Sequence, residues 1–328
     1  MPETDNAWND EELDRLFDEV SNAGRWGAAD ELGTLNFITP EKRRTAAALV
    51  RLGEVLSLAH PLVARPTPTH PQQVEHRMLY WNDSGNPLRA PASAGDSLGL
   101  EIHQHGITHL DCVSHIGSQS GRVYNDRLFD NVAADAGLTH GSIYAQRDGI
   151  VSRGVLLDVA GALGVGWLDP EHQITADDLE TAEHHGRVRV ERGDVLVVRA
   201  GVEARENEHG RSPLGPGPAP DAIRWLHERE VAVYAGDAPE HLSEAGAAIL
   251  GLLPAVPPGE DRSRPTRFPL VLHQIGIPAM GLVLLDYCRV EELARTCSEL
   301  ACYEFLFTAA PLVLPGGTGS PVNPLAIF

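Results

Sequence analysis

Cysteine is scarce in this sequence, and its placement excludes two common kinds of structural support. The 328 residues include four cysteines, Cys112, Cys288, Cys297 and Cys302, and none belongs to a C-x-x-C pair. That spacing fits neither a disulfide framework nor a cysteine-rich zinc site. We therefore expect reduced thiols, as in a cytoplasmic protein.

Basic residues and long apolar runs are also lacking. Lys and Arg number 26 against 46 Asp and Glu, which gives a formal net charge of −20 with neutral histidine. This surplus disfavours nucleic acid and anionic membranes as partners, because both are themselves negative. No apolar stretch approaches the roughly 20 residues of a membrane helix, and the acidic N-terminus lacks the basic and apolar regions of a signal peptide. We expect a cytoplasmic protein whose partner is a small-molecule substrate.

What the chain does contain is a dense histidine motif, His105-Gly-Ile-Thr-His109-Leu-Asp111-Cys-Val-Ser-His115. His109 and Asp111 are two residues apart, so on an extended strand they point to the same side. A turn at Gly106 would fold His105 back, and three ligand atoms would then converge on one metal ion. Imidazole and carboxylate together suit zinc, manganese or ferrous iron.

Three protein ligands leave a coordination position open for water, which is typical of a catalytic metal site rather than a structural one. A metal lowers the pKa of such a water toward neutrality. His115 follows Asp111 by four residues and would be free to carry a proton beside the metal. The motif also permits the reverse arrangement, in which His115 is the ligand and His105 is turned away.

The motif resembles the H-x-G-T-H-x-D-x-P-x-H signature of the metal-dependent cyclase family, which includes bacterial kynurenine formamidase and isatin hydrolase. The sequence departs from this signature at Ile107, where the family has glycine, and at Val113, where it has proline. Two further stretches, 24–36 and 316–324, resemble the beginning and the end of the longer members. The resemblance therefore covers nearly the whole chain.

The resemblance implies an α/β fold of the swivelling β/β/α kind, with a mixed sheet and surrounding helices in a single domain over residues 1–328. Residues from 1 to about 54 would be an N-terminal helical extension, and the protein would form a homodimer or homotetramer. A histidine and a later acid would hold a second metal, and His273 and Asp286 are the matching residues. Asp286 stands where the family more often has glutamate, and its shorter side chain favours one metal per chain.

The pattern of apolar residues and breakers independently predicts alternating helices and strands, and hence an α/β fold. Helices are expected at 9–23, from 39 onward, and at 175–185, 221–229 and 290–306. Strands are expected at 55–58, 98–104, 155–159, 195–198, 231–234, 281–286 and 309–314. Long loops are expected at 61–91, 203–220 and 254–269. In this prediction the strand at 98–104 leads directly into the histidine motif.

We interpret the chain as a metal-dependent hydrolase of an amide, lactam or lactone bond in a small cyclic or aromatic metabolite. His105, His109 and Asp111 would hold Zn²⁺ or Mn²⁺, and His115 would transfer the proton. Two other functions fit the same residues: a cyclase or dehydratase, and a protein that binds a metal-chelating metabolite without converting it. His115 favours catalysis, because a pure binding protein needs no proton carrier.

The residues of the substrate pocket are less sharply indicated. The candidates are Trp26, Trp81, Thr108 and Tyr124. Trp26 could equally be a residue of the hydrophobic core. Thr108 lies between predicted ligands and could instead fix their geometry by hydrogen bonding.

Overall fold

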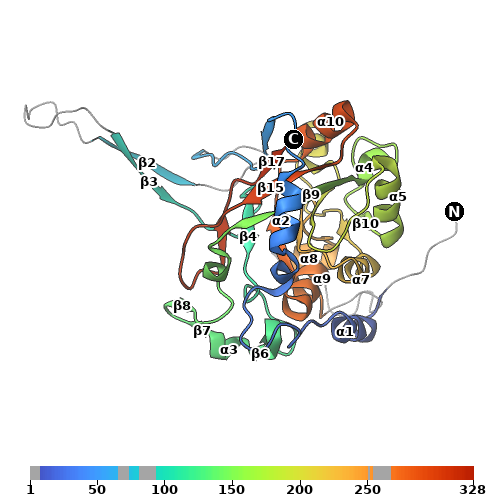
Figure 1. Ribbon diagram of the computed structural model, residues 1–328. Helices are drawn as coiled ribbons and strands as arrows, with labels where there is room; N and C mark the ends of the chain where they lie inside the picture. Colours follow the sequence, from blue (N-terminus) through green and yellow to red (C-terminus); the bar gives the residue numbers. More distant parts are fainter. Residues whose placement is uncertain (1–7, 66–73, 81–93, 250–251, 254–266) are drawn as a thin grey trace, which may run out of the picture.

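A computed structural model describes residues 8–65, 74–80, 94–249, 252–253 and 267–328 of the chain (Figure 1). In this part of the chain, nine strands form one mixed sheet in the order β1-β17-β15-β9-β11-β13-β14-β4-β16. Helices lie against the sheet, and the predicted α/β class is confirmed.

The strands of the main sheet are β1 Val55–Ser57, β4 His109–Asp111, β9 Ile150–Asp158, β11 Val195–Arg199, β13 Val233–Gly236, β14 Val283–Asp286, β15 Glu304–Ala309, β16 Gly319–Pro321 and β17 Leu325–Ile327. The other strands form two-stranded pairs: β2 Glu75–Tyr80 with β3 Ala94–Gly99, β5 Arg122–Val123 with β6 Arg127–Leu128, β7 Ala133–Ala134 with β8 Gly137–Leu138, and β10 Gln173–Ile174 with β12 Gly217–Pro218.

The longer helices are α1 Asp10–Glu19, α2 Pro40–Ala47, α5 Ala176–Gly186, α6 Val202–His209, α7 Pro220–Glu228 and α10 Glu291–Leu300. The shorter helical segments are η1 Gly33–Phe37, η2 Tyr124–Asp126, α3 Phe129–Val132, η3 Ile143–Gln146, α4 Val159–Ala162, α8 Glu244–Ile249, α9 Val271–Ile275 and the π-helical turn η4 Gly276–Met280. Within the described ranges, no helix combines the length and the apolar character that crossing a membrane requires.

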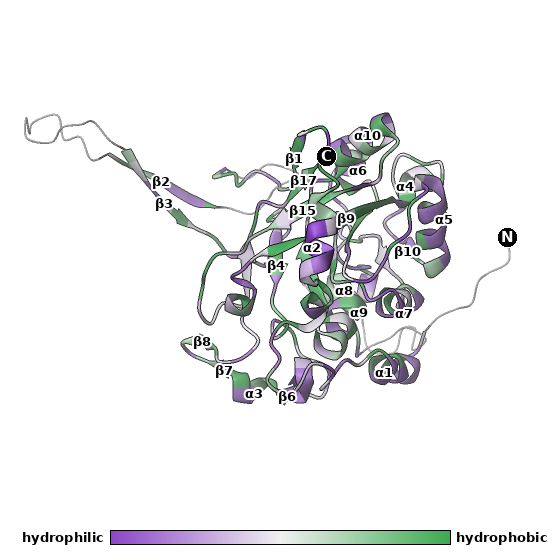
Figure 2. Ribbon diagram, viewed as in Figure 1, coloured by the Kyte–Doolittle hydropathy of each residue, from purple (hydrophilic) through white to green (hydrophobic). Residues whose placement is uncertain are grey.

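Four parallel strands, β9, β11, β13 and β14, form the centre of the sheet. Their sequences are almost continuously apolar because helices and loops cover both faces of the sheet. In β11, Val195 and Val197 belong to one hydrophobic core, whereas Leu196 and Val198 belong to the other. Figure 2 shows this contrast between apolar central strands and the hydrophilic residues of α2 and α5. The predicted strand at 195–198 is confirmed.

Local capping signals set the beginnings of several helices. Asn9 caps α1, Thr39 caps α2 with Pro40 in its first turn, and Thr175 caps α5. In each case the cap's side-chain oxygen accepts a backbone N–H that has no partner inside the helix. Such signals lie in a few consecutive residues, so the sequence located these helix starts closely. The end of α1 was predicted less closely: the helix stops at Glu19, whereas the prediction placed its end at residue 23.

A β-hairpin, formed by β2 and β3, projects away from the body of the molecule (Figure 1). The predictions for this region are partly wrong. β2 lies inside the expected loop 61–91, and the expected strand at 98–104 is β3, which ends at Gly99. The two strands pair with each other and not with the main sheet. The first part of the histidine motif therefore lies in a loop, residues 100–108, and no strand leads directly into the motif.

Three further predictions are corrected. Helix α6 lies in the expected loop 203–220, and none of its residues is fully buried, so no apolar stripe marks it in the sequence. The helix expected at 290–306 ends at Leu300, because Ala301 adopts the left-handed conformation with φ 49°. The chain then enters β15, so the strand expected at 309–314 lies at Glu304–Ala309.

Candidate metal centre

The site begins with the pairing of two strands. β4 lies between β14 and β16, with His109 opposite Asp286 and Asp111 opposite Gly319. Leu110 faces a hydrophobic core, so the alternation of the strand turns its two polar neighbours to the other side. The side chain of Asp286, opposite His109, lies on the same side as those of His109 and Asp111. Sheet register thus gathers three metal-ligating side chains on one face.

A hydrogen bond to the backbone fixes the orientation of the His109 ring. Its Nδ1 lies 2.7 Å from the carbonyl oxygen of Ile107. A carbonyl oxygen can only accept, so the proton sits on Nδ1 and leaves Nε2 as the free ligand atom. Nε2 lies 3.5 Å from Oδ1 of Asp111. An imidazole held by a backbone carbonyl in this way is the usual arrangement of a metal-bound histidine.

Asp111 places the strictest requirement on the site, because its carboxylate is a buried charge. Among the described residues, the groups nearest its buried carboxylate oxygens are histidine nitrogens: His103 at 2.9 Å and His109 at 3.5 Å from Oδ1, and His273 at 3.7 Å from Oδ2. Burial raises its pKa, but the surrounding histidines outweigh that effect and hold the pKa well below its usual range. The side chain is therefore a buried negative charge. Such a charge is stable only beside a cation or hydrogen-bond donors.

His103, which our sequence prediction did not include, completes this cluster. Ligand atoms of His103, His109 and Asp111 all lie within 4.8 Å of one another. Nδ1 of His103 is 2.9 Å from Oδ1 of Asp111. Its Nε2 is 3.0 Å from the hydroxyl of Thr318, in the loop before β16. One nitrogen of the ring is thus anchored and the other faces the site.

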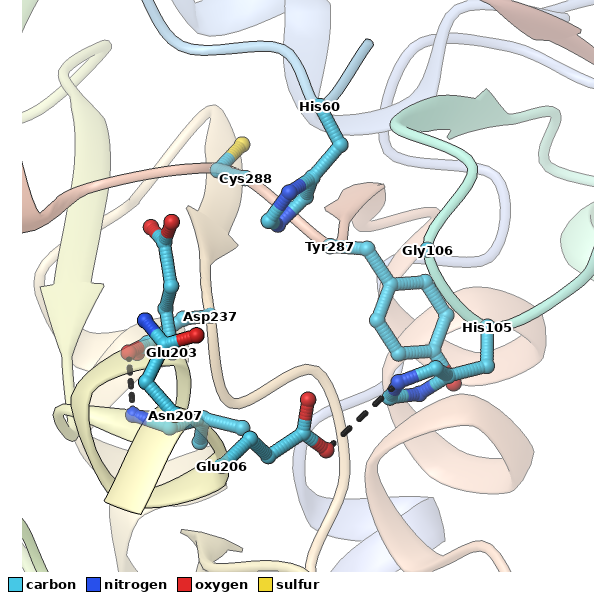
Figure 3. A pocket seen from close by; sticks show the side chains of 10 residues that line it. His60, His105, Gly106, Glu203, Glu206, Asn207, Asp237, Tyr287 and Cys288 are labelled. Carbon is cyan, nitrogen blue, oxygen red and sulfur yellow. Dashed lines mark hydrogen bonds and ion pairs between the residues drawn. The ribbon is translucent and has the colours of Figure 1, made fainter. Parts of the chain in front are cut away.

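His105, the expected third ligand, lies outside the cluster. Its Nε2 is 3.6 Å from Oε1 of Glu206 on α6, and its ring packs edge-on against Tyr287 at a centroid distance of 5.0 Å. Figure 3 shows His105 and Glu206 directed toward each other. Gly106 does turn the chain, with φ 80°. The turn, however, directs His105 toward α6, so the structure replaces His105 by His103 in the candidate ligand set.

A second triad shares Asp111 with the first. Ligand atoms of Asp111, His273 and Asp286 also lie within 4.8 Å of one another. Nε2 of His273, from the buried helix α9, is 3.1 Å from Oδ2 of Asp286 and 3.7 Å from Oδ2 of Asp111. The structure therefore brings together the two residues that the family resemblance suggested for a second metal.

Glu240 positions His273, and sequence reasoning missed it. Its carboxylate is buried and accepts the backbone N–H groups of Leu272 and His273. It also lies 3.0 Å from Nδ1 of His273, which leaves Nε2 directed at the two aspartates. Burial lowers the pKa of His273, but Asp286 and Glu240 outweigh it and raise that pKa well above its usual value.

The donor atoms fit a divalent metal. The two triads offer imidazole nitrogens and carboxylate oxygens, which suit zinc and manganese alike. In the described part of the chain, Oδ1 of Asp286 is buried and lacks a hydrogen-bond partner. A cation between these groups would neutralise charges that the fold otherwise buries without full compensation. His103, His109 and Asp111 would hold it.

His115 lies beside the first triad and outside both triads. Its ring stacks on that of His103, with a centroid distance of 3.8 Å and an interplanar angle of 11°. Burial is the largest influence and lowers the pKa of His115 to about 4, although Asp111 acts in the opposite direction. The imidazole is therefore neutral at pH 7. Part of it reaches an open groove of about 450 Å³ that Ser118, Leu128 and Phe129 also line.

A second, smaller cavity of about 50 Å³ lies on the side of His105 (Figure 3). His60, Glu206 and Tyr287 line it with His105. Tyr287 directly follows Asp286, a candidate ligand, and has φ 54°, a strained conformation for a bulky residue. Such a cavity has room for a few water molecules only.

Three of the residues expected in the substrate pocket are described by the structure, and none of them lines the groove beside His115. Trp26 packs edge-on against Phe37 at 5.0 Å, as a core residue would. Tyr124 is buried, and its hydroxyl donates to Asp30. Thr108 is buried as well; its hydroxyl donates to the carbonyl of Tyr287 and accepts the N–H of His60, so it ties β4 to its neighbours. Trp81 lies outside the described residues.

Some of the missed residues carry a signal in the sequence. His103 precedes His105 by two residues and so shares its side of an extended chain. Glu240 follows the carboxyl end of the parallel strand β13, where sites in α/β sheets commonly form. Glu206 carries no such signal, because the exposed helix that presents it was not recognisable.

Comparison with known proteins places the chain in a family. The model of the Cyclase family matches residues 56–241, more than half of the chain. A crystal structure described as a novel cyclase is 28% identical to the chain, with a TM-score of 0.76 over 94% of this chain and 99% of that one.

Proteins named isatin hydrolase are also similar. The enzyme from Roseibium aggregatum is 26% identical over 167 residues, which are 48% of this chain and 54% of the relative, so the match spans about half of that protein. An isatin hydrolase bound to the product analogue thioisatinate is 18% identical, with a TM-score of 0.52 over 85% of this chain and 93% of that one. Isatin hydrolase A from Ralstonia solanacearum is 19% identical, with a TM-score of 0.51 over 86% and 93%. At these identities, the two structures show a shared fold alone. The predicted cyclase-like fold is confirmed, and the chain belongs to the Cyclase family.

Proposed function

We propose that the protein is a metal-dependent hydrolase of an amide, lactam or lactone bond in a small cyclic or aromatic molecule. The observation that carries the proposal is the position of His115. A neutral imidazole lies against a buried cluster of metal-ligating groups and also reaches an open groove. Binding a metabolite requires the cluster and the groove, but only a reaction requires a proton carrier between them.

The roles of the residues follow from their protonation states. His103, His109 and Asp111 would hold a Zn²⁺ or Mn²⁺ ion, which when bound supplies a Lewis acid for a carbonyl oxygen. His115 is neutral at pH 7, so it can accept a proton from the attacking water. The protonated ring can then give that proton to the leaving nitrogen or oxygen.

The groove beside His115 supports a substrate with one apolar face. Leu128 and Phe129 supply apolar surface, and Ser118 and Ser120 supply hydroxyl groups. An aromatic or cyclic ring could pack on the apolar side while its polar edge meets the serines. The similarity to the protein from Roseibium aggregatum named isatin hydrolase favours a cyclic amide.

Two alternatives keep the same residues. A cyclase or dehydratase would use His115 to move a proton without consuming water. A binding protein would use the metal cluster and the groove, and it would need no proton transfer by His115.

The test is an assay of the purified protein, stripped with a chelator and reloaded with Zn²⁺ or Mn²⁺. Isatin, N-formylkynurenine and a small panel of lactones would be offered in a lightly buffered solution, and acid release would be followed. We expect metal-dependent acid release with at least one of them and none with Asp111→Asn. Metal-dependent conversion without uptake of water would favour the cyclase instead. Tight binding of a ligand without conversion would favour the binding protein.

A further inference from the structure

Cys302 is the cysteine that lies nearest to solvent. Cys112, Cys288 and Cys297 are buried, with exposed fractions of 1% or less, whereas Cys302 is half-buried. The Sγ atom of Cys302 donates to the backbone carbonyl of Glu304 at 3.3 Å. Because oxidation of a thiol depends on its exposure, an oxidant in solution should reach Cys302 before the other three.

The end of α10 brings Cys297 next to Cys302. The helix stops at Leu300, and Ala301 turns the chain with φ 49°. The backbone N–H of Cys302 donates to the carbonyl of Cys297 at 3.0 Å. The N–H of Ala301 donates to the carbonyl of Ser298 at 3.3 Å. These two bonds around a left-handed residue form the Schellman motif that ends many helices.

The two cysteines occupy the positions of this motif whose side chains commonly pack together. The first is the residue three before the helix cap, here Cys297, and the second is the residue after the left-handed one, here Cys302. The hydrogen bond between the two residues keeps their Cα atoms less than about 7 Å apart, given ordinary bond lengths. Within that limit, two cysteines can be joined by a disulfide without movement of the backbone.

The two thiols differ in reactivity. Burial raises the pKa of the Cys297 thiol, and the neighbouring Cys302 raises it further. A thiol that keeps its proton is a poor nucleophile toward an oxidant. Cys297 therefore stays unreactive by itself, but it stands where an oxidised Cys302 would meet it.

We propose that Cys302 and Cys297 form an oxidation site at which a peroxide converts the pair into a disulfide. In the first step, the O–O bond of hydrogen peroxide breaks, the Cys302 sulfur takes one oxygen as a sulfenic acid, and one water leaves. In the second step, the Cys297 sulfur displaces the hydroxyl group, which departs as water with the Cys297 proton. Two thiols and one peroxide thus give one disulfide and two waters.

The disulfide would protect Cys302 from irreversible oxidation. A sulfenic acid without a nearby thiol is oxidised further to sulfinic acid, which ordinary thiols do not reduce, whereas a disulfide is returned to the thiols by exchange. The bond would close only the turn between α10 and β15, whose ends the motif already holds together. Neither candidate triad contains a residue of this turn. The oxidation site is therefore independent of the proposed hydrolase activity.

The experiment is a peptide map of the reduced wild-type protein after treatment with hydrogen peroxide and alkylation under denaturing conditions. Trypsin leaves Cys297 and Cys302 together in the peptide 296–328, and it places Cys112 and Cys288 in two other peptides. We expect the peptide 296–328 to lose two hydrogen atoms and both alkylation sites, and dithiothreitol to restore them. Cys112 and Cys288 should remain fully alkylated.

Two variants serve as controls, and circular dichroism would check that each is folded. Cys297→Ala removes the partner thiol, so Cys302 should give sulfinic acid and, with dimedone present, more of the sulfenic acid adduct than in the wild type. Cys302→Ser removes the accessible thiol, so Cys297 should stay reduced.

The wild-type peptide map decides the matter even if a variant does not fold. The proposal is overturned if both cysteines of the peptide 296–328 stay alkylated at a peroxide dose that oxidises the exposed Met78 to its sulfoxide. It is also overturned if wild-type Cys302 gives mainly sulfinic acid, or if its disulfide joins two chains on a non-reducing gel.

Discussion

Asp286 lies directly opposite His109 in the antiparallel pairing of β14 with β4. The pair places one residue of each candidate triad side by side, and Asp111, two residues further along β4, belongs to both. Its Oδ1 faces His103 and His109, and its Oδ2 faces His273. The two triads are therefore parts of one site and depend on the same carboxylate.

That dependence predicts unequal effects of two matched substitutions. Asp111→Asn should remove nearly all bound metal, because it removes the ligand that the triads share. Asp286→Asn, a substitution of the same kind on the neighbouring strand, should leave the first triad occupied. Elemental analysis of both purified variants decides the matter. Equal metal content in the two would show that the triads do not share a ligand.

The number of metals per chain should depend on pH. The pKa of His273 is raised well above its usual value, so at neutral pH a proton occupies the nitrogen that the second triad needs. We expect about one metal per chain near pH 6.5 and a rise toward two as the pH increases and that proton is lost. Titration with Mn²⁺ at several pH values measures this. A second equivalent that binds equally well at every pH would contradict it.

Replacement of His115 should separate metal binding from turnover. His115→Asn should keep metal and fold, because His115 belongs to neither triad, and should lose about 10² to 10⁴ in rate, as expected for a lost general acid or base. Rate and metal content would be measured on the same sample. Loss of metal together with activity would instead identify His115 as a ligand, and an unchanged rate would remove it from the mechanism.

The same residue should make the stability of the metal-free protein depend on pH. Folding lowers the pKa of His115 from 6.5 to about 4. The unfolded chain therefore binds the proton more readily between these values, and stability falls as the pH falls through this window. The loss is at most about 3 kcal/mol, because part of the ring reaches solvent. Denaturant unfolding at pH 7 and pH 4.5 should show a smaller difference in the free energy of unfolding in His115→Asn than in the wild type.

His273 affects stability in the opposite sense and at higher pH. Its raised pKa gives stability that is present below pH 6.5 and is lost as the pH rises.

The projecting hairpin supports a homo-oligomer, which the sequence also led us to expect. A two-stranded hairpin is marginal by itself in water, and the side chains of Met78 and Leu98, which share one of its faces, are 47% and 54% exposed. We expect a dimer or tetramer by light scattering. Met78→Ser with Leu98→Ser should lower the mass toward that of one chain, whereas Leu312→Ser, another exposed apolar position, should not. A wild-type protein that is already monomeric would refute the expectation.

The sequence predicted best what depends on neighbouring residues. The caps Thr39 and Thr175 lie next to the helices they begin, and the apolar run at 195–198 marks its own strand. That His109 and Asp111 point to the same side of their strand follows from the alternation of side chains alone. The positions of His103 and His105 do not, because their polar partners Thr318 and Glu206 lie far away in sequence. Glu240 was missed for the same reason: its partner His273 is brought to it only by the packing of α9.

The position of β4 between β14 and β16 also fixes when the site can form. Leu110 pairs with Leu285 on one side and with Ser320 on the other. During synthesis, the histidine motif leaves the ribosome long before either partner exists, so it must wait unpaired while most of the chain is made. The first triad lies within residues 103–111, but the second needs His273 and Asp286 from much later in the chain. The shared carboxylate of Asp111 can therefore join the two triads only after β14 has been made and paired with β4.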